Sequence, residues 1–521
     1  QTTYEYDYTR PVHIHYPQYP QNDVYYTYDS VGRLSMVQDV TGTERMEYDA
    51  MGNVSLSERT IVIPTELTAY RFTTHFSYDA FGRMRSITYP DGEVVNYNYS
   101  HGLLCSVNGS AAIPYIRSME YNEYDAPISI AHGNGLTTVL SYENVHHRPI
   151  RRQLNGSNTT LQDITYTYDP VGNITNIAQD KNKAGNLGGK YSVAYTYDDQ
   201  YRLTRAVQSS SQLGGYDYSM SYSPSGLVST KSCTEISANM IFGYTQGYPS
   251  QFYDHRPRMA YSSNAEDIML LRWDMNGQVT HIGLPHKDEF RRHVWNEAGQ
   301  LVAAFGNAHC GYYAYDAQGN RTYKLTGTMT EEQHNAGYPS YRAYFDDVVL
   351  YVNPYMVVTP RGYTKHYYNG SQRIASRLGD YWNQSGTFVS TDNIIDRADT
   401  LWLNTVSVTE SPYQDMEGDY QYIQADGTNL PIVSYGPYIS SIRGVHGEDM
   451  LSSVFSGHQR ETIAGNSSGI YFYHSDHLGS SNWITNGQGQ AVQYIHYMPY
   501  GELWVNQQAS IYDERYKFTG K

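Results

Sequence analysis

Residues 166–177 read YTYDPVGNITNI, and this short stretch decides the fold that the sequence predicts. Tyr166 and Tyr168 alternate with a threonine, which puts both rings on one face of a β-strand. Asp169 follows the strand, and its carboxylate can accept backbone N–H bonds from a turn. Gly172 supplies the positive φ that closes a short hairpin loop, and a second strand follows. The stretch therefore predicts a β-hairpin whose turn is held by one aspartate and one glycine.

The same order of an aromatic residue, an aspartate and, three positions later, a glycine recurs along the chain. Tyr28, Tyr48 and Tyr78 start copies that lie 20 and 30 residues apart, which suits one hairpin with its two turns. So many ordered copies are hard to explain as unrelated turns, and they predict an array of stacked hairpins. The clearest copies are Tyr28, Asp29 and Gly32; Tyr48, Asp49 and Gly52; Tyr78, Asp79 and Gly82; Tyr168, Asp169 and Gly172; and Tyr315, Asp316 and Gly319. Weaker copies begin at Tyr197, Tyr222, Trp273 and Trp295, and a shortened one at Tyr89.

Tyrosine dominates the aromatic residues of the chain. The 521 residues include 56 Tyr but only 12 Phe and 6 Trp. Tyrosine favours strands and carries a hydroxyl that needs a partner when it is buried. We therefore expect thin sheets that pack through ladders of tyrosine. The alternative is that exposed tyrosines stack against sugars.

Charge and cysteine content exclude several classes of partner. The net charge is −16, whereas nucleic acids and anionic membranes recruit clustered Lys and Arg, so neither is expected as a partner. No apolar run of 18 residues occurs, and no membrane-spanning helix is expected. Cys105, Cys233 and Cys310 are widely separated, so neither a disulfide framework nor a zinc site is indicated. No cofactor is predicted.

Three features of the sequence could carry metal or catalytic chemistry. His474, Asp476 and His477 offer two imidazoles and a carboxylate, but a strand points His477 away from the other two. Hydrogen bonding around a turn is therefore the preferred interpretation, and metal binding is the alternative. His146 and His147 have no carboxylate at metal spacing and are assigned to a solvated loop. The repeat aspartates are expected to cap turns rather than bind calcium, because each repeat supplies only one. No carboxylate pair or GxSxG motif stands out, so we expect a protein that is not an enzyme.

The repeats closely resemble the YD repeat of RHS proteins, a group that includes the C components of insecticidal toxin complexes and the teneurins. Residues 471–483 (YFYHSDHLGSSNW), 497–502 (YMPYGE) and 518–521 (FTGK) resemble the RHS-associated core region. Residues 363–378 resemble the aromatic-rich rung that commonly precedes that region. The residues of these motifs also resemble those of RHS proteins from the Bacteroidetes lineage. The core motif is carried by Tyr473, Asp476, His477, Leu478, Gly479, Ser480, Pro499, Gly501 and Glu502.

This resemblance implies an all-β fold in which hairpins spiral into a hollow, cocoon-like shell, closed near the C-terminus by the core region. With the pattern of repeats, it implies a YD-repeat spiral over 1–324 and further strand rungs over 325–380. An irregular insertion or plug-like segment is expected over 381–470, and the start of the core region over 471–521. In many such proteins a variable C-terminal toxin is cleaved by an aspartyl-protease-like site of the shell and is held inside.

Encapsulation and delivery of a C-terminal effector is accordingly the expected function, with no catalytic, cofactor or metal residue assigned. The self-cleaving aspartates and the toxin are expected beyond Lys521. Expected partners are the protein's own toxin as cargo and a companion shell protein or secretion apparatus. The expected location is secreted or at the bacterial cell surface, with a cytoplasmic stage before export. The alternative function is an extracellular adhesion module whose YD array binds glycans or a protein.

Overall fold

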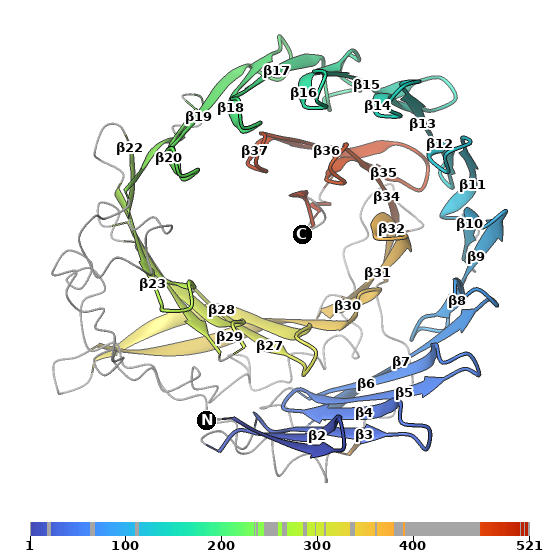
Figure 1. Ribbon diagram of the computed structural model, residues 1–521, viewed down its shortest axis with the longest axis vertical. Helices are drawn as coiled ribbons and strands as arrows, with labels where there is room; N and C mark the ends of the chain where they lie inside the picture. Colours follow the sequence, from blue (N-terminus) through green and yellow to red (C-terminus); the bar gives the residue numbers. More distant parts are fainter. Residues whose placement is uncertain are drawn as a thin grey trace. The chain divides into compact units, whose positions relative to one another are not determined.

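The computed structural model consists of β-strands joined by turns (Figure 1). Within the residues that it describes there is no α-helix, and therefore no helix long and apolar enough to cross a membrane. The predicted all-β fold class is confirmed. The segment predicted as an insertion, 381–470, lies outside the described residues except for 389–390 and 469–470. The structure describes residues 2–379, 389–390 and 469–518, except 18–21, 63–67, 110–113, 234, 236–237, 244–258, 263–267, 285–288, 297, 307–308, 334–338, 360–361, 511 and 515.

The chain forms two compact units, and each draws on separate stretches of the sequence. Unit 1 contains residues 1–75 and 240–363 together with strand β33. Its strands are β1 (Thr3–Asp7), β2 (Arg10–His15), β3 (Val24–Tyr28), β4 (Leu34–Asp39), β5 (Gly42–Tyr48), β6 (Val54–Val62), β22 (Met259–Ser262), β23 (Ile268–Trp273), β24 (Val279–Leu284), β25 (Glu289–Trp295), β26 (Leu301–Gly306), β27 (His309–Tyr315), β28 (Arg321–Gln333), β29 (Pro339–Asn353), β30 (Met356–Thr359) and β33 (Val389–Ser390).

Unit 2 contains residues 76–239, 364–380 and 459–521. Its long run of strands is here called the array: β8 (Met84–Thr88), β9 (Val94–Ser100), β10 (Leu103–Asn108), β11 (Ile116–Tyr121), β12 (Pro127–His132), β13 (Thr137–Tyr142), β14 (Pro149–Asn155), β15 (Thr160–Tyr168), β16 (Ile174–Gln179), β17 (Tyr191–Tyr197), β18 (Leu203–Ser209), β19 (Tyr216–Tyr222) and β20 (Val228–Cys233). Later in the chain come β32 (Gln372–Gly379), β34 (Ile470–Ser475), β35 (Ser481–Asn486), β36 (Ala491–Tyr497) and β37 (Leu503–Gln508). Three strands run across the sequence boundaries between the units: β7 (Thr68–Tyr78), β21 (Ala238–Gly243) and β31 (Gly362–Asn369).

Each repeat forms a tight turn between two antiparallel strands. In the first copy, the N–H of Asp29 donates to the carbonyl of Arg33 at 2.8 Å, and the N–H of Gly32 donates to the carbonyl of Asp29 at 3.0 Å. The Asp29 carboxylate accepts the N–H groups of Val31 and Arg33 at 3.0 and 2.8 Å. Gly32 has φ of +88°, which side chains rarely adopt. The same turn occurs at Asp49 and Gly52, Asp79 and Gly82, Asp169 and Gly172, and Asp316 and Gly319.

The partner strand carries one extra residue beside several of these turns. Thr27 pairs with Met36 but Tyr28 pairs with Leu34, so the register shifts just before the tyrosine. Equivalent shifts precede Tyr48, Tyr168 and Tyr315. A β-bulge of this kind bends the strand and re-aims the side chain next to it.

The re-aimed tyrosine ties its hairpin to the preceding one. The Tyr48 hydroxyl donates to the backbone carbonyl of Leu34, the first residue of β4, at 2.6 Å. Arg33 lies over the Tyr48 ring at 4.6 Å and also pairs with Asp29 at 2.8 Å. We call this hydroxyl-to-carbonyl contact the tyrosine bond. It recurs from Tyr28, Tyr99, Tyr121, Tyr142, Tyr168, Tyr197, Tyr222, Tyr315 and Tyr497.

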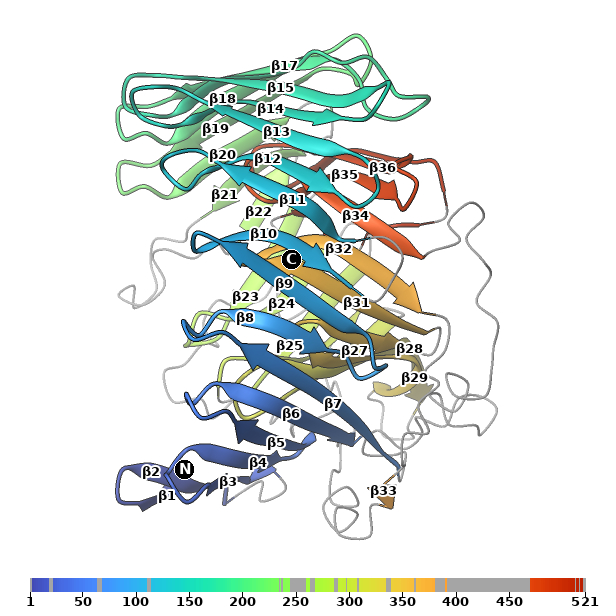
Figure 2. The same ribbon diagram turned by 90° about the vertical axis from the view of Figure 1, so that its right-hand side faces the viewer.

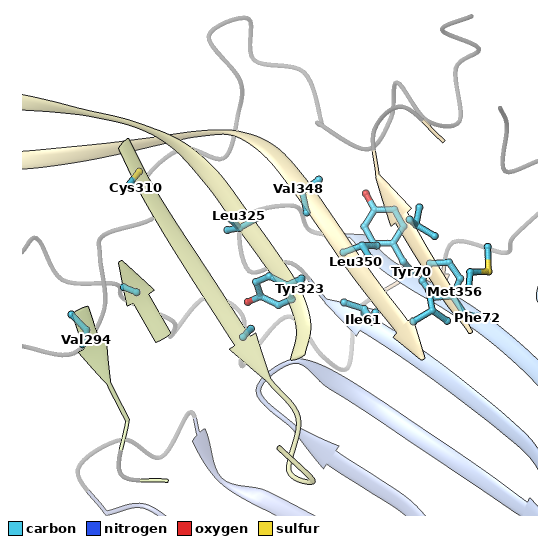
Figure 3. Packing of buried hydrophobic residues seen from close by; sticks show 14 of the residues in the cluster. Ile61, Tyr70, Phe72, Val294, Cys310, Tyr323, Leu325, Val348, Leu350 and Met356 are labelled. Carbon is cyan, nitrogen blue, oxygen red and sulfur yellow. The ribbon is translucent and has the colours of Figure 1, made fainter. Parts of the chain in front are cut away.

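The core of unit 1 joins strands that are far apart in the sequence. Ile61, Tyr70 and Phe72 from β6 and β7 pack with Leu325 and Leu350 from β28 and β29 (Figure 3). An ion pair at the same joint is also nearly buried. Arg59 approaches Asp316, the repeat aspartate of the β27–β28 turn, at 3.0 Å and Glu44 at 3.1 Å.

Removing one tyrosine hydroxyl should weaken the array by a measurable amount. Tyr48→Phe keeps the ring under Arg33 but leaves the Leu34 carbonyl without this donor, which should cost about 1 kcal/mol. Urea denaturation followed by far-UV circular dichroism would measure the loss. Tyr8→Phe is the matched control, because the Tyr8 ring is 94% exposed. Equal midpoints for the two variants would contradict the role of the tyrosine bond.

The turn glycine can be tested without a steric clash. A Cβ at Gly52 would meet no atom within 4 Å, so Gly52→Val reports only the cost of its φ of +90°. That cost should be about 1–2 kcal/mol of unfolding free energy. Met51→Val, at the neighbouring and 72% exposed turn position, is expected to change stability much less. The left-handed assignment would be wrong if both valines had the same effect in urea denaturation.

Candidate functional site

The core motif lies in and between four antiparallel strands, β34 to β37, which we call the core sheet, and most of its residues form the β34–β35 and β36–β37 turns. Every residue of β34 and β35 is buried, although both strands contain many polar residues. Strands buried on both faces need a covering layer on each side, and buried polar groups need hydrogen-bond partners. The array covers one face, and residues 512–514 and 516–518, here called the tail, cover the other.

The turn of the DHLGS sequence is the repeat turn again. The Asp476 N–H donates to the carbonyl of Ser480 at 2.9 Å, and its carboxylate accepts the N–H groups of Leu478 and Ser480 at 2.8 and 2.9 Å. Gly479 has φ of +83°. The side chains of His477 and Leu478 are exposed. The core motif is therefore built with the same local geometry as a YD repeat.

The YMPYGE sequence forms a second turn of this kind without an aspartate. The N–H of Met498 donates to the carbonyl of Glu502 at 2.8 Å, and Pro499 occupies the next position of the turn. Gly501 has φ of +96°, and a side chain there would collide with the Phe518 ring of the tail. Glu502 pairs with Lys231 of β20, and this ion pair joins the turn to the last strand of the array.

The core sheet lies beside the array (Figures 1 and 2), and polar side chains join the two. Gln162 Nε2 donates to Asn482 Oδ1 at 2.7 Å. Asn134 Nδ2 donates to Thr485 Oγ1 at 2.8 Å. His496 Nε2 contacts Gln208 Oε1 at 2.7 Å. Apolar packing surrounds these contacts, with Trp483 and Tyr494 of the core sheet against Leu136, Leu154, Leu161 and Leu187 of the array side.

Tyrosines join the core sheet to the tail, and one buried ion pair joins the tail to β32, the strand that pairs with β34. The Tyr471 and Tyr512 rings stack at 3.8 Å, and the hydroxyls of Tyr473 and Tyr512 lie 2.7 Å apart. Tyr512 also donates to Glu514 at 2.6 Å, and Arg373 of β32 approaches the same carboxylate at 2.6 Å. Glu514 is 2% exposed. Breaking such a buried pair is costly, so the tail is held by more than its apolar contacts.

The three candidate metal ligands of the core motif do not converge on one point. His474 is buried, and its Nε2 contacts Thr485 Oγ1 at 2.9 Å, while its ring meets that of His132 edge-on at 4.6 Å. Burial lowers the pKa of His474 well below its ordinary value. Asp476 is engaged by its own turn, and the His477 side chain is exposed.

The other sequence candidates also have local partners. Both His146 and His147 are exposed, and the His147 ring lies 3.9 Å from that of Tyr124. The repeat aspartates direct their oxygens at the N–H groups of their own turns, which argues against calcium loops. No disulfide joins Cys105, Cys233 and Cys310.

Sequence reasoning missed a buried charge cluster in unit 2. Lys365 and Glu93 are both nearly inaccessible and form an ion pair. Glu93 also accepts the hydroxyls of Tyr115 and Tyr367 at 2.7 and 2.8 Å, and Asp91 approaches Lys365 at 2.6 Å. The signal was the acidic pair in the shortened repeat that begins at Tyr89, but its partner lies over 270 residues away. The cluster fixes β31 to the β8–β9 turn.

Comparison with known proteins gives three kinds of similarity. The RHS Repeat family model matches residues 71–94, which include the third repeat turn. Toxin subunit YenC1 of Yersinia entomophaga is 27% identical over 299 residues, covering 50% of this chain and 30% of YenC1. Toxin subunit YenC2 of the same organism is 30% identical over 139 residues, covering 25% of this chain and 14% of YenC2. The chain therefore spans less than a third of either relative.

Solved structures share the fold along the whole chain. The crystal structure of TcdB2-TccC3-Cdc42 matches with a TM-score of 0.62 at 15% identity, covering 100% of this chain and 24% of that one. The Photorhabdus luminescens Tc holotoxin pore matches with a TM-score of 0.62 at 15% identity, covering 98% of this chain and 23% of that one. Together with the sequence matches, these findings confirm the resemblance to RHS proteins and toxin-complex subunits.

Acid should destabilise the joint between the core sheet and the array. Burial lowers the pKa of His496 to about 4, below the value of about 6.5 for an unfolded histidine. Between these values only the unfolded chain binds the proton, so the unfolding free energy falls as pH drops from about 6.5 towards 4. His496→Gln should reduce this slope by about 1.4 kcal/mol per pH unit. Urea denaturation over this pH range measures the slope.

The matched control is His146→Gln, which removes an exposed histidine. Its stability curve should run parallel to that of the parent protein. A parallel curve for His496→Gln as well would show that the buried imidazole does not control the acid response.

Proposed function

We propose that this RHS-repeat chain forms part of the wall of a toxin-complex shell. The observation that carries the proposal is the likeness in fold, over the whole chain, to TcdB2-TccC3 structures. The sequence relation to the toxin subunits YenC1 and YenC2 supports the same assignment. The chain spans only part of each relative, so the shell as a whole is part of the proposal.

The bonding pattern suits a wall. Each hairpin is tied to its predecessor by a backbone ladder and, in many repeats, by a tyrosine bond. Such an array grows by adding equivalent units and needs no thick apolar core. The core sheet adds a second layer over part of the array, secured by the Gln162–Asn482 and Asn134–Thr485 contacts. Two layers of strands suit the role of the core sheet as the segment that closes a container.

The finer parts of the proposal concern cargo and partners. The shell would enclose a toxin encoded downstream of the core region, keep it from proteases and release it at delivery. A companion toxin-complex subunit would complete the container, in keeping with the two components named in the matched TcdB2-TccC3 structure. The particle would act outside the cell that makes it. The wall itself would take no part in catalysis.

Protection from protease tests the enclosed cargo. The natural gene product, with its downstream region and its companion subunit, would be treated with proteinase K, and the downstream segment followed by mass spectrometry. We expect the segment to survive in the folded particle and to be digested once urea unfolds the array. The same segment expressed alone is the control. Equal digestion in the folded particle and in the isolated segment would overturn the shell proposal, as would a cryo-EM map without an enclosed cavity.

An adhesion module is the second candidate, and one observation favours it. Tyr4 and Tyr6 on β1 are 55% and 58% exposed, and their rings stack at 6.4 Å. Exposed aromatic faces can stack on sugars. Many other tyrosines in the described residues are instead buried within or between strands, as Tyr218, Tyr323 and Tyr367 are. Glycan-array binding that disappears in a Tyr4→Ala, Tyr6→Ala variant would favour adhesion over encapsulation.

A further inference from the structure

Two histidines and an aspartate meet on one face of the first three strands of unit 1. His13 and His15 lie two residues apart in β2, so their side chains share a face. Asp23 directly precedes β3, whose residue Val24 pairs with Ile14 of β2. His13 Nε2 and His15 Nδ1 lie 3.0 and 2.8 Å from the same Asp23 oxygen, Oδ2. One oxygen thus sits between two imidazole nitrogens.

We propose that His13, His15 and Asp23 bind one divalent first-row metal ion, with zinc as the cation that fits best. The three potential ligand atoms lie within 4.8 Å of one another, close enough for a single ion to replace the hydrogen bonds between them. Imidazole nitrogen and carboxylate oxygen are ligands that zinc takes in tetrahedral sites, and three protein ligands leave a fourth position for water. The assignment does not depend on the shell proposal.

Neighbouring groups orient the three ligand side chains, as the groups next to metal ligands commonly do. The N–H of Tyr16 donates to Asp23 Oδ1 at 2.9 Å, which turns the other oxygen towards the histidines. Glu5 on β1 lies 3.6 Å from His13 Nδ1. A carboxylate at that nitrogen favours the tautomer that leaves Nε2 free to ligate. The Tyr25 ring stacks on His13 at 4.4 Å and limits rotation of the imidazole.

Burial and access also suit a metal site. The Asp23 side chain is 6% exposed, and a buried carboxylate is well compensated by a bound cation. The His15 side chain is 38% exposed, so an ion can enter from solvent. The ion would join β2 to the start of β3. It would also link β1 to these strands indirectly, because Glu5 of β1 contacts the ligand His13. In the described part of the chain, this is the group of His, Cys, Asp and Glu side chains that is compact enough for one ion.

Metal binding by the purified full chain tests the proposal. The protein would be stripped with EDTA, dialysed and titrated with ZnCl2 alone by isothermal titration calorimetry, with bound zinc counted by mass spectrometry. We expect one zinc per chain and a higher melting temperature on adding zinc. Asp23→Asn and His15→Gln should each weaken binding at least tenfold, and Glu5→Gln by about 10-fold, the usual loss for a group behind a ligand.

The matched control is His146→Gln, His147→Gln, which removes two exposed histidines elsewhere and should leave zinc binding unchanged. Co²⁺ offers an independent readout, because its visible spectrum should report nitrogen and oxygen ligands and change in His15→Gln. That variant alters the most exposed of the three ligands, so it keeps the test open should Asp23→Asn fail to fold. Absence of zinc binding, or binding of equal strength in the ligand variants, would overturn the proposal and leave a hydrogen-bonded cluster.

Discussion

The tyrosine bond is the contact on which the rest of the molecule depends. The backbone ladder alone holds adjacent strands together, but strands can slip in register. A side-chain hydroxyl that reaches the first carbonyl after the preceding turn fixes that register, because only one carbonyl lies at the right place. The aspartate, the glycine and the bulge at each turn exist to aim the ring. A single such bond contributes little, about 1 kcal/mol, but the array repeats it many times.

Reuse of one turn explains how the core sheet can close onto the array. The DHLGS and YMPYGE turns have the same backbone hydrogen bonds as the repeat turns, so both sheets are built from hairpins with the same turn geometry. Two layers with matched geometry can interlock along their length. The contacts that join them include buried polar ones within the apolar packing, as in Gln162 with Asn482, and polar contacts fail when they are misaligned. The core sheet therefore has one favourable position on the array. A purely apolar interface would allow the two layers to shift relative to each other.

Several titratable side chains of the molecule serve its structure. Asp476, which looks functional in the sequence, is held by its own turn, and the buried Glu93 is held by Lys365 and two tyrosines. His13, His15 and Asp23 differ, because their ligand atoms face each other and one imidazole remains open to solvent. A metal at this place would strengthen the joint among the first three strands. Strands that are held together by weak repeated bonds are stabilised most by a strong local link of this kind.

What the sequence alone determined is local. The hairpin of residues 166–177, its Asp169 cap and the left-handed Gly172 follow from groups within five residues of each other, where chain connectivity sets the geometry. The repeat at Asn122, with Asp125 in the glycine position at φ of +60°, escaped detection because the aspartate and glycine had both been replaced.

Only the tertiary structure decided the partners across the fold. Gln162 and Asn482 are 320 residues apart, and Glu93 and Lys365 are 272 apart, so no spacing in the sequence links them. The grouping of His13 and His15 with Asp23 likewise needed the pairing of β2 with β3. Local geometry is encoded in adjacent residues, whereas the choice among many similar amides and carboxylates is made when strands bring two of them within hydrogen-bond distance.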